Sequence, residues 1–537
     1  MAYFSLHSYD ADVWISEFRG LNQSDTGLNP NPVYAAIAEN VETPNGVLQP
    51  QAACPELAGE FENRVETLAS FYRRWYEGPG SKEWYICASG GKLYYRQAGD
   101  DGGAWAEIDL PSGIDAFQSN VWSWVTYEIN PENSDDTVDV LLMSNGLDGM
   151  IMIVPPDRPT TWGDTKEHTW GYLLDMTWLE VSSPAWHIIT IATGDKKFGV
   201  IERYAERIWA AAITDNPDML MYSRPYDPTD WTGPGVDEEP EDAAGDILQP
   251  TWDGDRFYAL RRFGDQLLAF KKNRVFRILN TDPGSYVIKE QFGGGTEFFN
   301  TLAVDAERVY MVGDQGVSVF DGMSTYPFWR EQASELWKTI NKSALDQICA
   351  TLYRQKYYVA FPVGDSPVNN GMLCYDLKEK TVLYYKDFSV EAFLPTDGEL
   401  FITSSTLPGK VLRLRYNSWD EKTVRGAATR WVSPWMDFGV KSIQKGGFEL
   451  YMIPEVQAEA VTLKISIQTE KKLKTKTYTV QPLTAEQLEA NKEHRGKRLH
   501  FGGTGRKFRV VIETDEGVTA PWRLIGGLQL IVETDPD

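Results

Sequence analysis

Residues 83–96 read EWYICASGGKLYYR, two aromatic and apolar runs on either side of a Gly-Gly pair. Aromatic and β-branched residues fit the half-buried surface of a strand, and adjacent glycines adopt the positive φ angles of a tight hairpin turn. The segment therefore predicts a β-hairpin. Similar hairpins are predicted along the chain at residues 138–154, 207–223, 265–279, 308–320, 356–385 and 399–415.

The spacing of these hairpins is the main indication of architecture. Their centres lie near residues 90, 146, 216, 272, 314, 366 and 406, a repeat of about 40 to 70 residues that suits propeller blades of four strands with loops. Circular closure leaves only short, protected sheet edges. The sequence predicts an all-β protein with a β-propeller of about seven blades, six to eight being allowed. A series of β-sandwiches is the alternative.

The last part of the chain differs in charge. Residues 425–537 hold 17 Lys and Arg against 14 Asp and Glu, a balance of +3, so the overall −25 leaves −28 for the first 424 residues. Alternation in VTLKISIQ (461–468) and KFRVVIE (507–513) predicts strands with one buried face. We therefore expect an N-terminal arm and first strand in 1–47, the propeller in 48–424, and a C-terminal β-sandwich or jelly-roll in 425–537. Short helices are predicted at 334–339 and 485–494.

Composition excludes several classes of function. An acidic chain does not suit general nucleic-acid binding or docking on an anionic membrane. The four cysteines are scattered and form no CxxC pair, so reduced, buried thiols are expected. No targeting segment or long apolar run is apparent, and no membrane insertion is expected.

Catalytic and cofactor motifs are also missing from the sequence. It contains no Gly-x-Ser-x-Gly, P-loop, HExxH or EF-hand pattern, so we expect no enzyme activity, no cofactor and no metal site. Carboxylates beside tryptophans can build sugar sites, which makes Trp231, Trp252, Asp230 and Asp255 a possible glycan contact. Turn-forming Asp residues are the plainer interpretation of that cluster.

Two charged segments are candidate interaction surfaces. Basic residues gather in the last part of the chain, at Lys471, Lys472, Lys474, Lys476, Arg498, Arg506 and Lys507. Acidic residues gather in the loop 236–246, at Asp237, Glu238, Glu239, Glu241 and Asp242. The basic cluster could face an acidic neighbouring subunit or a polyanion. Solvated strand faces and loop tips are the alternative for both.

Several short motifs follow one another in a fixed order along the chain. They are Gly20-Leu21-Asn22, Ala38-Glu39-Asn40-Val41, Gly46-Val47-Leu48, Arg207-Ile208-Trp209, Asn216-Pro217-Asp218, the stretch 222–231 (YSRPYDPTDW), 263–271 (FGDQLLAFK), Gly313-Asp314-Gln315-Gly316-Val317 and Phe320-Asp321-Gly322, then 431–437, 505–509 and 531–537. Together these segments resemble the propeller-bearing nozzle or tail-hub ("stabilisation") proteins of tailed bacteriophages. Gln49-Pro50-Gln51 stands where the family usually has an Arg.

The resemblance implies a structural virion protein made in the host cytoplasm. Copies would form a ring, expected to be hexameric, that continues the DNA channel, retains and releases the genome, and contacts an adaptor above and fibres or spikes. An acidic lumen would let genomic DNA slide in transient, non-specific passage. Two alternatives remain open: a propeller at the tail tip that binds a receptor or glycan, and a propeller glycosidase.

Overall fold

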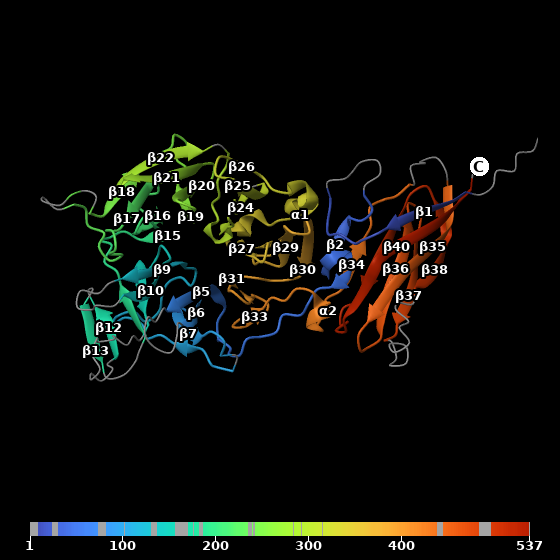
Figure 1. The fold of residues 1–537 in the computed structure, drawn as a ribbon, viewed down its shortest axis with the longest axis horizontal. Helices are drawn as coiled ribbons and strands as arrows, with labels where there is room; N and C mark the ends of the chain where they lie inside the picture. Colours follow the sequence, from blue (N-terminus) through green and yellow to red (C-terminus); the bar gives the residue numbers. More distant parts are fainter. Residues whose placement is uncertain are drawn as a thin grey trace, which may run out of the picture.

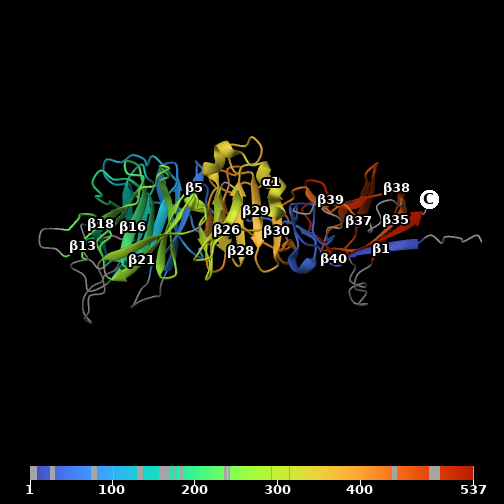
Figure 2. The ribbon, with the colours of Figure 1, turned by 90° about the horizontal axis from the view of Figure 1, so that it is seen from above.

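The computed structural model describes residues 9–23, 31–73, 82–100, 102–129, 137–155, 170–174, 177–181, 186–234, 239, 242–282, 284–291, 293–313, 315–437, 444–482 and 496–535. Strands dominate this part of the chain, and helical turns are few and short. The molecule is elongated, with a broad body of sheets at one end and a smaller β body, containing the last strands, at the other (Figures 1 and 2).

The broad body consists of antiparallel sheets that follow one another along the chain. Within the described residues, six groups contain four strands each. The first is β5 (Val65–Arg73), β6 (Lys82–Ser89), β7 (Lys92–Gln97) and β8 (Ala106–Glu107), and the second is β9 (Ser123–Ile129), β10 (Val138–Ser144), β11 (Met150–Val154) and β14 (His187–Thr190). The third is β15 (Phe198–Tyr204), β16 (Arg207–Ile213), β17 (Met219–Tyr222) and β18 (Gly245–Leu248), and the fourth is β19 (Phe257–Phe263), β20 (Gln266–Lys271), β21 (Val275–Asp282) and β22 (Ser285–Gln291). The fifth is β23 (Ala303–Val304), β24 (Val309–Gly313), β25 (Gly316–Phe320) and β26 (Thr325–Pro327), and the sixth is β27 (Cys349–Tyr353), β28 (Lys356–Phe361), β29 (Gly371–Asp376) and β30 (Thr381–Lys386). A three-stranded group follows, β31 (Phe393–Pro395), β32 (Leu400–Thr403) and β33 (Val411–Arg413). A hairpin of β12 (Trp170–Leu174) and β13 (Thr177–Val181) is inserted before β14.

The first strands of these groups contact one another in a closed circuit. β5 contacts β9, β9 contacts β15 and β15 contacts β19; the turn η2 (Phe299–Thr301) bridges β19 to β27, β27 contacts β31, and β31 returns to β5. Buried apolar side chains fill the space between neighbouring sheets. Successive four-stranded antiparallel sheets with this closure are the pattern of a β-propeller, as the hairpin spacing predicts.

The three-stranded group is completed by a segment that precedes β5. Leu57 N donates to Val411 O at 2.8 Å, Arg413 N donates to Pro55 O at 2.8 Å, and Phe61 N donates to Gly409 O at 2.9 Å. The outer edge of β33 is thus covered by chain from the other end of the circuit, which removes an exposed sheet edge.

Helical segments are confined to connections between strands. Within the described residues they are η1 (Pro44–Gly46), η2 (Phe299–Thr301), η3 (Arg330–Ala333), α1 (Ser334–Lys338), η4 (Lys342–Gln347) and α2 (Ser418–Glu421). The helix predicted at 334–339 is confirmed by α1. The one predicted at 485–494 lies outside the described residues.

The smaller body contains strands from both ends of the chain. One sheet continues outward from β30 through β2 (Ile37–Glu39), β34 (Thr429–Val432), β39 (Phe508–Thr514), β36 (Val461–Thr469) and β37 (Leu473–Val480). The other has the order β1 (Tyr9–Ile15), β40 (Trp522–Asp535), β35 (Gln444–Val456) and β38 (Lys497–Gly505). Buried side chains of β35, β36, β39 and β40 share one apolar cluster. The alternation expected for 461–468 is observed in β36.

The N-terminal segment is not a separate arm, which corrects the expected division at residue 47. β1 pairs antiparallel with β40, from Tyr9 opposite Thr534 to Ile15 opposite Leu528. β2 lies between β30 and β34. The physical reason is burial, because Ile15 and Phe18 are enclosed in the apolar cluster shared with the last strands. The propeller is therefore inserted between two halves of the smaller body.

Candidate functional site

The predicted basic residues gather at one edge of the smaller body. β37 ends one sheet and β38 ends the other, and these two edge strands contact each other. Lys476 Nζ lies 5.7 Å from the centre of the Phe501 ring, and Lys497 Nζ lies 5.0 Å from that of Tyr478. Side chains of each strand thus reach the other across the edge.

The turns at the end of these strands are held together by one carboxylate. Glu470 accepts from Arg506 N at 2.8 Å and from Lys507 N at 2.9 Å. This contact places the turn before β37 beside the turn after β38. The structure therefore brings together residues that are more than thirty positions apart in the sequence.

In the part of the chain that the structure describes, most side chains of this basic patch form no ion pair, although the Glu470 carboxylate lies within it. Arg498 pairs with Glu449 at 3.1 Å. Within the described residues, Lys471, Lys472, Lys474, Lys476, Arg506 and Lys507 form no ion pair with an acidic side chain. β37 is exposed along most of its length, including Leu473 at its start. Lysines on an edge strand oppose uncontrolled strand pairing, and they also form a positive surface for an acidic partner.

Only part of the acidic loop belongs to the described residues. Asp237, Glu238 and Glu241 lie outside the described residues, whereas Glu239 and Asp242 are exposed to solvent. The Asp242 carbonyl oxygen accepts from Arg224 Nε at 2.9 Å. That contact fixes the base of the loop to the turn after β17.

The residues proposed as a glycan contact do not form one surface. Trp231 is a core residue: it packs 4.6 Å from the Phe198 ring, and its Nε1 donates to Pro228 O at 3.0 Å. Trp252 is 91% exposed and lies over Arg274. Only the second tryptophan is open to a ligand, so this candidate is corrected, because packing of the 222–231 turn encloses the first.

The two carboxylates of that candidate cap turns. Asp230 accepts from Thr232 N at 2.9 Å and pairs with Arg224 at 3.3 Å. Asp255 accepts from Lys272 N and Asn273 N at 3.2 and 2.9 Å. These contacts match the plainer interpretation, in which Asp residues stabilise turns.

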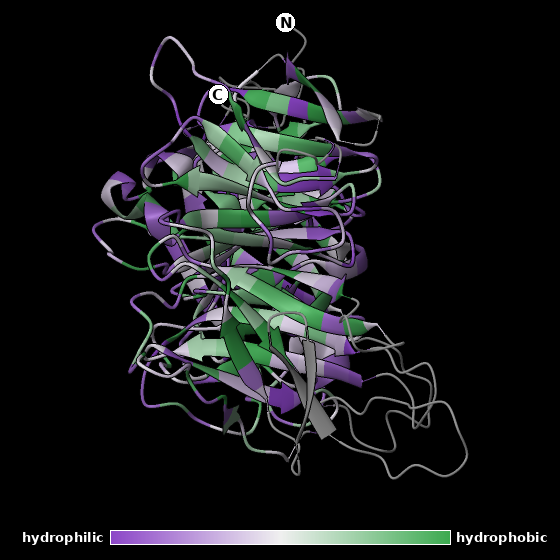
Figure 3. Ribbon diagram, turned by 90° about the vertical axis from the view of Figure 1, so that its left-hand side faces the viewer, coloured by the Kyte–Doolittle hydropathy of each residue, from purple (hydrophilic) through white to green (hydrophobic). Residues whose placement is uncertain are grey.

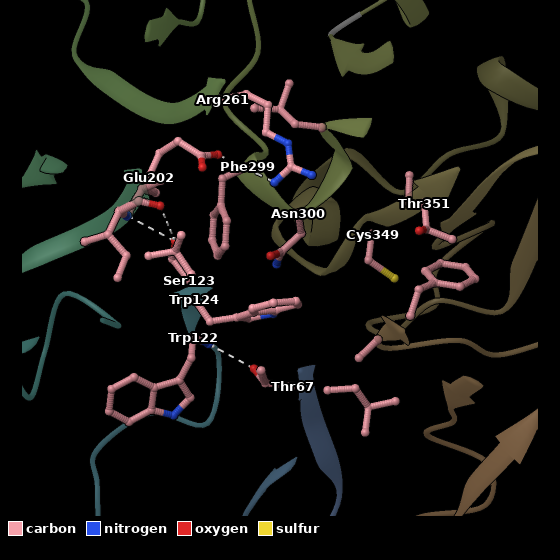
Figure 4. A pocket seen from close by; sticks show the side chains of 18 of the residues that line it. Thr67, Trp122, Ser123, Trp124, Glu202, Arg261, Phe299, Asn300, Cys349 and Thr351 are labelled. Carbon is pink, nitrogen blue, oxygen red and sulfur yellow. Dashed lines mark hydrogen bonds and ion pairs between the residues drawn. The ribbon is translucent and has the colours of Figure 1, made fainter. Parts of the chain in front are cut away.

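A cavity that the sequence does not indicate lies at the centre of the closed circuit. Its volume is about 370 Å³, and its wall includes residues of β5, β9, β15, β19, η2, β27 and β31. Figure 4 shows Glu202, Arg261, Phe299, Asn300 and Trp124 around it. We call it the axial pocket. Its residues are far apart in the sequence, so no local motif could have revealed it.

The charged groups of the axial pocket are largely paired. Glu202 Oε2 lies 3.7 Å from Arg261 Nη1, and Glu391 pairs with Arg64. Glu66 accepts from Asn120 Nδ2 at 2.9 Å. Burial raises the pKa of both Glu202 and Glu391, while the neighbouring arginines oppose this shift. Three lining side chains are therefore carboxylates and one, Arg261, is a guanidinium, while Arg64 pairs with Glu391 without lining the pocket.

Lys271 and Glu42 are two of the buried charged residues that the sequence did not predict. Lys271 is fully buried, and its Nζ donates to Gln249 O at 3.0 Å and Asp255 O at 2.7 Å and pairs with Asp218. Glu42 is fully buried where the chain enters and leaves the propeller. Sequence reasoning misses both because charged side chains are rarely buried.

The described residues contain no grouping of three or more His, Cys, Asp or Glu side chains able to hold a metal ion. Their helices include none with the length and apolar character needed to cross a membrane. Cys87, Cys349 and Cys374 are buried as free thiols, as predicted, and Cys54 is free and half-buried.

Comparisons with known proteins find structural likenesses at low sequence identity. No family model and no curated protein matches the chain. Similar solved structures include the computationally designed Ika8 protein (9% identity, 67% of this chain and 99% of that chain, TM-score 0.35). Others are the Neurospora crassa Pan2 WD40 domain (12%, 68% and 96%, 0.33) and PorZ, a surface component of the type-IX secretion system of Porphyromonas gingivalis (11%, 80% and 58%, 0.35). No functional argument follows from likenesses this remote.

Proposed function

We propose that this chain is a structural protein of a bacteriophage tail, in which copies form a ring that continues the DNA channel and docks neighbouring tail proteins. We also infer a seven-bladed propeller, with residues 55–61 as the outer strand of the last blade, and a C-terminal β-sandwich. The shared apolar cluster between the two sheets of the smaller body supports the sandwich.

The observation that carries the proposal is the separation of charge within one chain. Residues 1–424 carry −28 and residues 425–537 carry +3, and the basic patch is largely unpaired. A positively charged surface on a molecule that is mostly negatively charged favours head-to-tail contact between copies. Such contacts close into a ring when the rotation between copies permits.

The residues that carry the family resemblance form scaffolding, which supports a structural role. Arg207 is buried and donates from Nη1 to Ser223 O at 2.9 Å and to Ala243 O at 2.5 Å. Trp209 is buried between β15, β17 and β22. Leu21 N donates to Val382 O, so the Gly-Leu-Asn segment is fastened to the propeller.

DNA passage is the second part of the proposal. A predominantly acidic ring would repel phosphates, so genomic DNA would pass without strong binding. We expect assembled rings not to retain duplex DNA at physiological salt. Retention of DNA by a basic lumen would contradict this part while leaving the ring itself intact.

Charge reversal of the basic patch tests the assembly. The variant Lys471→Glu/Lys472→Glu/Lys474→Glu should remain monomeric at concentrations where the wild type assembles. The control Lys342→Glu/Lys378→Glu reverses two exposed lysines of the propeller and should assemble normally. Wild-type assembly should weaken between 50 and about 300 mM salt, because screening shortens the reach of surface charges to within about 10 Å. Assembly that is unchanged in the first variant would refute docking through this patch.

A further inference from the structure

The axial pocket contains polar groups whose hydrogen-bonding capacity is unused. Among the described residues, no group donates to or accepts from the Asn300 side-chain amide. The Arg261 guanidinium has one partner there, the Glu202 carboxylate at 3.7 Å, which is too long for a hydrogen bond. The Asn300 amide and the Arg261 guanidinium both line the cavity. Donors and an acceptor are therefore available there, because an amide side chain carries both and a guanidinium carries donors.

Aromatic side chains form another part of the wall. Trp124 from β9 and Phe299 from η2 are half-buried. In Figure 4 the Arg261 and Asn300 side chains lie on one side of the Trp124 ring, with Phe299 between Glu202 and Asn300. An apolar ring next to convergent polar groups is the usual composition of a small-molecule site, and about 370 Å³ lies within the usual size range.

The lining groups limit the chemistry of the ligand. A strongly anionic ligand would meet the carboxylates of Glu66, Glu202 and Glu391, and a strongly cationic one would meet Arg261. A neutral ligand whose hydroxyl groups both donate and accept can satisfy an amide, a guanidinium and a carboxylate together. Its C–H face can cover an aromatic ring. Saccharides combine these two properties.

We propose that the axial pocket binds a neutral saccharide of one or two rings, with Asn300 and Arg261 contacting hydroxyl groups and Trp124 contacting the ring face. This site is distinct from the exposed Trp252. The proposal goes beyond the tail-ring function and does not depend on it, because the pocket lies within one copy of the chain.

Binding to the purified full-length chain tests the proposal. The probes are glucose, galactose, N-acetylglucosamine, maltose and lactose, followed by saturation-transfer NMR and by tryptophan fluorescence. We expect at least one to bind with a Kd below about 10 mM. Asn300→Ala should weaken it about tenfold, the effect of losing one hydrogen bond to the ligand, with an unchanged melting temperature.

Two further variants complete the test. Trp124→Phe keeps an apolar ring but reduces its area, and should weaken binding without loss of folding. Trp252→Ala should bind as the wild type does. The proposal is overturned if none of the five sugars binds, if Asn300→Ala and Trp124→Phe both bind normally, or if Trp252→Ala abolishes binding. Binding of spermidine or citrate in place of every sugar would also overturn it.

Discussion

Replacing Glu42 by Gln should change how the stability of the chain depends on pH. Glu42 ends β3 (Val41–Glu42) and is completely buried. Its carboxylate accepts from Asn417 N at 2.9 Å, from Gln49 Nε2 at 3.3 Å and from Ala52 N at 3.4 Å. These donors precede and follow the propeller, and Gln49 lies in β4 (Gln49–Pro50). Glu42 therefore joins the entry and exit strands of the propeller.

The magnitude follows from the pKa of this group. Burial raises the pKa of Glu42 from 4.5 to about 7, and the three hydrogen bonds only partly oppose it. Below pH 4.5 the side chain is protonated in both folded and unfolded states, so it imposes no penalty. Between 4.5 and 7 the unfolded chain loses its proton first, and folding becomes less favourable by about 1.4 kcal/mol per pH unit. Above 7 the loss levels off at about 3 kcal/mol.

Thermal unfolding of wild type and Glu42→Gln at pH 5, 6, 7 and 8 measures this effect. Glutamine cannot ionise, so the stability difference between the two proteins should shift by about 3 kcal/mol in favour of the variant from pH 5 to pH 8. The exposed Glu516→Gln is the control and should follow the wild type. A constant difference between wild type and Glu42→Gln across this range would refute the buried, protonated carboxyl.

Three other outcomes follow from the packing. Lys271→Met should lower the free energy of unfolding by about 3 to 5 kcal/mol, because it leaves Asp218 and two carbonyl oxygens without their cation. Lys272→Met removes a surface ion pair with Glu297 and should lower it by less than about 1 kcal/mol. Calorimetry of both variants measures the difference, and equal losses would contradict this prediction. Trp231→Ala should lower the free energy of unfolding by about 3 to 5 kcal/mol and Trp252→Ala by less than about 1 kcal/mol, since only Trp231 is buried. Urea unfolding of the two variants measures both losses, and a larger loss for Trp252→Ala would contradict this prediction. Cys87 and Cys374 should not react with a thiol reagent in the native protein, because both are enclosed and burial raises the pKa of their thiols. Rapid labelling of either would contradict this.

Local chemistry allowed the hairpins to be predicted, but long-range pairing remained out of reach. The Gly-Gly turn at 90–91 is flanked by the observed strands β6 and β7, because turn type and strand propensity are encoded by neighbouring residues. The pairing of β1 with β40 joins the two ends of the chain, and neither segment contains a signal for the other. Residues 55–61 lack strand periodicity, yet they close the propeller through three backbone hydrogen bonds.

The candidate sites also differ in how far the sequence alone could predict them. The basic residues were found in the sequence because charge is visible there, and both turns contribute to one patch through Glu470. The glycan candidate failed because proximity in sequence does not reveal burial, as Trp231 shows. The axial pocket was missed because each strand contributes only two to four residues to its wall.

Imaging of the purified full-length chain at low salt tests the central claim most directly. The account predicts closed rings of one size, with the basic edge of β37 and β38 at the contact between adjacent copies, and dissociation of these rings as salt is raised. Single, separate copies at every protein and salt concentration, or rings whose contacts leave Lys471, Lys472 and Lys474 facing solvent, would contradict it.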